Sequence, residues 1–129
     1  MAVVALPHAP TSAAAARRRL VEELTELGLP QAVVADAEIV IAEMVGNAVT
    51  HGRPLADGAV RAAWELCGSE LVLKVTDGGS QTRPSVGTPT DIYDEANGRG
   101  LAIVSAITPQ WGSEPHAQGL QTWAKIGLL

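Results

Sequence analysis

The chain has few of the features that disulfide-bonded, metal-binding, nucleic-acid-binding and membrane-spanning proteins require. Its single cysteine, Cys67, excludes an internal disulfide, and a reducing, intracellular setting is the default. The three histidines lie too far apart for a local metal motif. Lys and Arg number 9 against 14 Asp and Glu, and their scatter leaves no basic stripe for nucleic acid. Since no apolar run approaches the roughly 20 residues of a membrane span, we expect a cytoplasmic protein.

The length and composition favour one globular domain over the whole chain, residues 1–129. Hydrophobic residues make up 47% and charged residues 18% of the 129 residues, which is typical of a folded, soluble protein. A chain of this size buries one core and leaves no room for a second catalytic domain. The sequence therefore directs attention to a single site.

Two helices are predicted in the first half of the chain. The first covers residues 11–27, where Thr11 or Ser12 can cap its start. The second covers residues 31–50, because Pro30 suits the first turn of a helix and the run contains no further proline. Both helices carry apolar residues at helical spacing, so each should cover a core.

The remaining elements are predicted to be strands and one more helix. Segments of alternating apolar and polar residues, or of β-branched residues, predict strands. Pairs rich in Gly and Pro predict turns, and an apolar run after a glycine pair predicts the helix. The strands are at 3–6, 60–67, 71–76, 110–113 and 121–128, with a turn at 115–119, and the helix is at 101–107. Strands in hairpins with grouped helices predict an α+β fold: a two-layer α/β sandwich with a mixed, mostly antiparallel sheet and helices on one face.

Three segments carry candidate functional residues. Glu43, Asn47 and His51 are four residues apart, so they share one face of the second helix, which a solvated face would explain equally well. Asp77 leaves a strand directly into glycines that allow a close backbone approach. A later glycine pair, Gly98 and Gly100, opens a helix, whose N-terminal N–H groups favour a phosphate.

In this order the three segments resemble the N, G1 and G2 boxes of the GHKL (Bergerat-fold) ATPases, a superfamily that includes the histidine-kinase-like ATPase domains. The likeness is closest to the bacterial anti-sigma factor serine/threonine-protein kinases. Their motifs read Glu-x-x-x-Asn-Ala-x-x-His, then Asp-x-Gly, then Gly-Arg-Gly-Leu. The corresponding residues here are Glu43, Asn47, Ala48, His51, Asp77, Gly79, Gly98, Arg99, Gly100 and Leu101.

The resemblance implies a role for each residue of the first box that we single out. Asn47 would coordinate the Mg²⁺ ion that bridges the phosphates, a hard cation that prefers oxygen ligands. Glu43 would be the general base that orients a water or a protein hydroxyl towards the γ-phosphate. His51, at the end of the helix, is interpreted as structural.

The other two boxes would bind the rest of ATP. Asp77 would accept a hydrogen bond from the adenine amine, and Gly79 would let the base lie against the backbone. Residues 98–101 would cradle the phosphates, with Arg99 adding a positive charge. The loop at 80–97 would be the ATP lid.

The resemblance also implies partners and leaves alternatives open. A kinase of this kind phosphorylates an anti-sigma antagonist protein, sequesters a sigma factor, and commonly forms a homodimer. The chain departs from the family at Gln81, where a further G1 glycine is common, and at Gln121, where the last strand usually has a threonine. These departures favour one alternative, an ATP-dependent switch without phosphoryl transfer. A degenerate module for protein interaction that has lost its affinity for the nucleotide is a further alternative.

Overall fold

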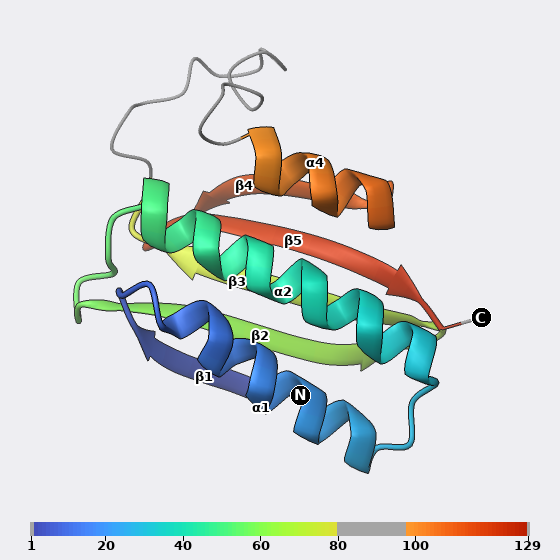
Figure 1. The fold of residues 1–129 in the computed structure, drawn as a ribbon. Helices are drawn as coiled ribbons and strands as arrows, with labels where there is room; N and C mark the ends of the chain where they lie inside the picture. Colours follow the sequence, from blue (N-terminus) through green and yellow to red (C-terminus); the bar gives the residue numbers. More distant parts are fainter. Residues whose placement is uncertain (1, 80–97, 129) are drawn as a thin grey trace.

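Five strands and three helices form the part of the chain that the structure describes (Figure 1). This computed structural model describes residues 2–79 and 98–128, with the backbone alone at 98–101, so the predicted lid and Gln81 lie outside it. The strands are β1 (Ala2–Pro7), β2 (Ala59–Cys67), β3 (Glu70–Asp77), β4 (Trp111–His116) and β5 (Gly119–Gly127). The helices are α1 (Ser12–Glu26), α2 (Gln31–His51) and α4 (Gly98–Ile107).

The sheet has the strand order β1-β2-β3-β5-β4, and the three helices lie on one of its faces (Figure 1). The predicted α+β two-layer fold is therefore confirmed. The prediction of a mixed sheet is wrong for the described strands, because all four pairings are antiparallel. The helix α4 carries the chain back along the sheet, so β3 and β4 run in the same direction, but β5 lies between them.

The core lies between the helices and one face of the sheet. Alternate residues of each strand point into it, as the period of two in a pleated strand requires. The fully buried side chains include Leu20, Leu24, Val40, Ile41, Val45, Val60, Leu71, Leu73, Val75 and Val104. The opposite face of the sheet carries the intervening residues, among them Lys74, Trp123 and Lys125.

The helices end close to the predicted positions, but α1 starts by a different mechanism. Thr11 is the N-cap residue and makes no side-chain cap bond. The hydroxyl of Ser12, which is buried, donates to the carbonyl oxygen of Pro7 instead. The predicted hydroxyl cap is therefore wrong: a buried hydroxyl must find a partner, and the tight loop after β1 offers this carbonyl.

No helix in the described ranges is long and apolar enough to cross a membrane.

The β4–β5 hairpin is longer than predicted. Residues 115–119 were expected to form its turn, yet β4 continues to His116 and β5 begins at Gly119. Pro115 lies within β4 and pairs with Leu120. Because β4 is an edge strand of the sheet, a proline there can direct its missing N–H away from the ladder.

Candidate functional site

Glu43 and Asn47 lie one turn apart on α2, and both are half-buried. Their neighbours Met44, Val45 and Ala48 are buried and hold α2 over β3 and β5. The helix α4 packs along α2 (Figure 1). The two polar side chains therefore sit at the rim of the core, next to the helix whose first turn is the third predicted segment.

The end of α2 and the exit of β3 interlock through their backbones. The N–H of Gly78 donates to the carbonyl oxygen of Arg53 at 2.7 Å, and the N–H of Arg53 donates to the carbonyl oxygen of Gly79 at 2.8 Å. Arg53 follows Gly52, the C-cap residue of α2. Two segments that the sequence marks separately, the second helix and the Asp77 turn, therefore lie side by side.

Asp77 is a buried carboxylate with 6% of its surface exposed. It follows Leu73 and Val75 on the face of β3 that the helices cover. Its Oδ1 accepts a hydrogen bond from the N–H of Gly79 at 2.7 Å. Burial raises the pKa of this carboxyl, while the Gly79 N–H and the His8 imidazole act to lower it. Burying a carboxylate lowers the stability of the fold, and buried groups of this kind are typical of functional sites.

Three glycines around Asp77 have a packing role that sequence reasoning missed. A Cβ at Gly52 would lie 2.5 Å from Oδ2 of Asp77 and 2.6 Å from the carbonyl oxygen of Ala48. A Cβ at Gly78 would collide with the Pro54 carbonyl, and one at Gly119 would collide with the backbone of Asp77. Backbone therefore packs directly on backbone here, and the only sequence signal was that Gly52 and Gly78 each follow a regular element and Gly119 begins one.

The last strand places its polar residues on opposite faces. Gln121 pairs with Thr76, and its Nε2 donates to the Thr76 hydroxyl at 3.2 Å on the face away from the helices. Thr122 pairs with Val75, so it lies on the same face as Asp77. Its hydroxyl is 3.1 Å from that of Ser113 on β4. Thr122, not Gln121, therefore offers a hydroxyl on the side of the sheet where the candidate site lies.

The first turn of α4 consists of residues 98–101. Figure 1 places this turn at the same end of the molecule as the last turn of α2 and the end of β3. The N-terminus of a helix favours an anion through its N–H groups and dipole. The three predicted segments thus meet at one end of the fold, whereas the side chain of Arg99 lies outside the description.

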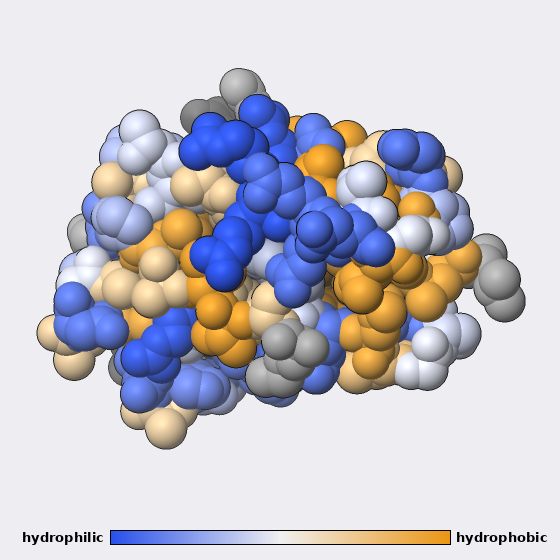
Figure 2. Space-filling model, turned by 90° about the horizontal axis from the view of Figure 1, so that it is seen from below, coloured by the Kyte–Doolittle hydropathy of each residue, from blue (hydrophilic) through white to orange (hydrophobic). Residues whose placement is uncertain are grey.

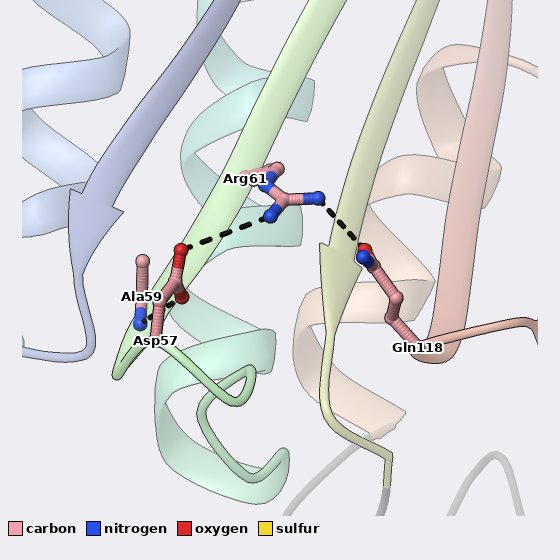
Figure 3. A network of polar contacts seen from close by, with 4 residues as sticks. All are labelled: Asp57, Ala59, Arg61 and Gln118. Carbon is pink, nitrogen blue, oxygen red and sulfur yellow. Dashed lines mark hydrogen bonds and ion pairs between the residues drawn. The ribbon is translucent and has the colours of Figure 1, made fainter.

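A polar network lies on the open face of the sheet at this end (Figure 3). The Arg61 Nη1 donates to Oε1 of Gln118 at 2.7 Å, and its Nη2 lies 3.7 Å from Oδ2 of Asp57. Asp57 in turn accepts the N–H of Ala59 at 3.0 Å. Since Arg61 pairs with Thr76, it reaches across the end of β3 and connects the loop before β2 to the β4–β5 turn.

Comparison with known proteins agrees with this geometry. The family model described as a histidine kinase-like ATPase domain matches residues 6–125. The chain belongs to this family. Domains of this family bind a nucleotide, usually with Mg²⁺. Among curated proteins, no significant match is found.

One solved structure is similar to this histidine kinase-like ATPase domain over nearly its full length. It is the crystal structure of the RsbU and RsbW domains of Rv1364c from Mycobacterium tuberculosis, with a TM-score of 0.74 and 25% sequence identity. The match covers 98% of the present chain and 32% of that chain, so the present chain spans about a third of its neighbour's length. Together the family and this neighbour support an ATP-binding regulatory role.

The residues of this ATPase domain fit a magnesium ion that is held mainly by the nucleotide. In the described ranges, no group of three His, Cys, Asp or Glu side chains could hold a metal ion by itself. Mg²⁺ commonly takes one or two protein oxygens and completes its shell with phosphates and water. The amide oxygen of half-buried Asn47 is a ligand of this kind.

A hollow of about 220 Å³ lies at the other end of the domain. It is lined by Ala2, Glu23, Leu24, Leu27, Trp64, Glu65, Leu66 and Leu71. Two of its polar groups are hydrogen-bonded to each other, since Nε1 of Trp64 donates to Oε2 of Glu23 at 2.8 Å. Figure 2, turned about the horizontal axis from Figure 1, shows hydrophobic side chains at the right, the side where this end lies, and a further group towards the left. The hollow includes no residue of the three boxes.

Proposed function

We propose that this ATPase domain is a regulatory protein of the anti-sigma type. In this proposal it is a serine/threonine kinase that phosphorylates an antagonist protein and, in its other state, sequesters a sigma factor. The observation that carries the proposal is the buried Asp77 carboxylate, fixed by the Gly79 N–H beside the end of α2. The RsbW domain in the neighbouring structure supports the choice of partners.

Asp77 would select adenine through the hydrogen-bonding edge of the base. An ionised carboxylate only accepts hydrogen bonds, so it suits the exocyclic amine of adenine and rejects the carbonyl that guanine carries there. The bond from Gly79 fixes Oδ1, which leaves the carboxylate in one orientation. Gly79 has φ 101°, a conformation that lets the backbone turn close to a base.

The phosphates would lie between α2 and the first turn of α4. When bound, Mg²⁺ neutralises phosphate charge and orients the γ-phosphate for transfer. Asn47 would hold this ion through its amide oxygen, and residues 98–101 would offer N–H groups to the phosphate oxygens. Arg99, in that turn, would add a positive charge.

Glu43 would be the general base for phosphoryl transfer. It lies one turn before Asn47 on the same face of α2, so a base near the metal also lies near the γ-phosphate. As the serine oxygen of the antagonist bonds to phosphorus, its proton passes to the Glu43 carboxylate and the bond from phosphorus to ADP breaks.

A matched pair of variants tests the kinase. The tagged chain captures partner proteins from a lysate of its source cells, and γ-labelled ATP with Mg²⁺ is added. We expect the label on serine or threonine of a captured protein with the wild type. Glu43→Ala should bind ATP but transfer no label, and Asn47→Ala should lose the Mg²⁺-dependent part of ATP binding and transfer no label. Retained transfer by Glu43→Ala would contradict the base assignment.

A second candidate is an ATP-dependent switch that transfers no phosphoryl group. The sequence has Gln81 where a further G1 glycine is common, which favours the switch, although Thr122 offers a hydroxyl on the site face of the last strand. A switch would release or capture a partner on exchange of ATP for ADP, and no captured protein would carry the label. The same capture experiment therefore separates the two functions.

A further inference from the structure

His8 lies in the loop between β1 and α1, in a segment that none of the three boxes includes. Its Nε2 is 2.9 Å from the carbonyl oxygen of Gly52, 44 residues further along the chain. A carbonyl can only accept a hydrogen bond, so the imidazole is the donor and carries its proton on Nε2. This bond joins the first loop of the protein to the C-cap residue of α2.

Gly52 also contacts the Asp77 carboxylate. The space that a Cβ of Gly52 would fill is 2.5 Å from Oδ2, so the carboxylate rests against the bare Cα. The next residue, Arg53, makes the two backbone bonds to Gly78 and Gly79. The position of the Gly52 peptide therefore sets the position of both sides of the Asp77 turn.

The imidazole is also close enough to Asp77 to affect it electrically. Burial raises the pKa of the Asp77 carboxyl, and the Gly79 N–H and the His8 imidazole both act to lower it. His8 is therefore linked to Asp77 in two ways: through its bond to Gly52, and through its effect on the pKa of Asp77.

We propose that His8 is a positioning residue for the nucleotide site: by holding the Gly52 carbonyl, it fixes the backbone that aims the Asp77 carboxylate at adenine. His8 acts through Gly52 and does not touch the nucleotide. The inference rests on the proposed function, in which Asp77 accepts the adenine amine. It extends the site to the first loop, a part of the chain that the three motifs leave out.

Calorimetry of ADP binding with three variants tests this role. His8→Ala removes the donor and should weaken ADP binding about fivefold, the effect of one net hydrogen bond. His8→Gln can donate to the same carbonyl and should restore the affinity to within about twofold of the wild type. Ser12→Ala is the control, because it removes the Ser12 to Pro7 bond from the same loop and should leave ADP affinity unchanged. An equal loss in Ser12→Ala would overturn the proposal in favour of general loop order.

A nucleotide-free readout separates this inference from the proposed function. The amide proton of Gly79 reports its bond to Asp77 in an NMR spectrum of the free protein. We expect His8→Ala to shift this proton and His8→Gln to return it, with Ser12→Ala unchanged. An unshifted Gly79 proton and unchanged ADP affinity in His8→Ala would refute the role of His8 alone. A wild type that binds no ADP would refute the proposed function, and the Gly79 signal would still decide whether His8 positions Asp77.

Discussion

Where β3 leaves the sheet, backbone packs against backbone, whereas at the other end, where β2 turns into β3, leucine side chains fill the space. The first end has Gly52, Gly78 and Gly119 around a buried carboxylate. The second has Leu24 and Leu71, both fully buried, beside the hollow. The buried carboxylate at the first end lowers the stability of the fold, whereas the buried leucine side chains at the second end raise it.

The difference indicates what each end is for. Large buried side chains contribute the hydrophobic free energy of the fold. Close glycine contacts and a desolvated Asp77 do not, so their presence is better explained by a ligand that they bind. Changes at the leucine end should therefore alter stability, and changes at the glycine end should alter nucleotide affinity.

The largest expected effect is on stability, at the leucine end. Leu71→Ala should lower the free energy of unfolding by about 2 to 5 kcal/mol, because it removes a fully buried side chain and leaves a cavity. Leu66→Ala, at a side chain with 44% exposure, is the control and should change stability by no more than about 0.5 kcal/mol. Urea unfolding measures both. Loss of ADP affinity in the folded Leu71→Ala protein would contradict the division between the two ends.

Next is a change at the glycine end. Gly52→Ala places a Cβ against Asp77 and the Ala48 carbonyl, which should abolish ADP binding and destabilise the protein by about 1 to 3 kcal/mol. Gly46→Ala in the same helix is the stability control. Its Cβ meets nothing within 4 Å, so it should stabilise by about 0.5 to 1 kcal/mol. Calorimetry and urea unfolding check these results. A Gly52→Ala protein with normal ADP affinity would contradict the different roles of the two ends.

Asp77→Asn should separate function from stability. Burial raises the pKa of Asp77 above 3.8, so the native state holds this proton more tightly than the unfolded state. The carboxylate therefore costs stability at pH 7, and Asp77→Asn should be the more stable protein there while losing adenine selectivity. The difference should shrink as the pH falls through the native pKa towards 3.8. Urea unfolding at several pH values would contradict this if the wild type were the more stable at pH 7.

The smallest effect is expected on the open face of the sheet. Arg61→Ala breaks the contacts to Asp57 and Gln118 in Figure 3, all of them exposed. Exposed pairs contribute about 0 to 1 kcal/mol, so the melting temperature should fall only slightly. ADP affinity should stay within about twofold of the wild type. A larger loss of affinity would mean that this network positions the Asp77 turn.

Much of the fold was predictable from local patterns. The alternation in residues 60–76 and the long run without proline after Pro30 predicted β2, β3 and α2 closely, because each signal is local. The hairpin of β4 and β5 was less accurate, since Pro115 signals a turn and only its place on an edge strand permits it.

The candidate site was predictable in its motifs and not in its contacts. The motifs predict Asp77 as a candidate, and its burial and its bond to Gly79 are visible only in the structure. The contacts of Gly52 and Gly119 join segments far apart in the chain, and a single sequence carries no signal of such packing. His8 was missed for the same reason, because its partner lies 44 residues away.

The most direct test of the account is calorimetry of ATP and ADP binding with and without Mg²⁺, comparing the wild type with Asn47→Ala. We predict that the wild type binds both nucleotides, that Mg²⁺ strengthens binding, and that Asn47→Ala loses this dependence. Absence of binding by the wild type at millimolar nucleotide would contradict the account and leave a domain of this fold that serves protein interaction alone.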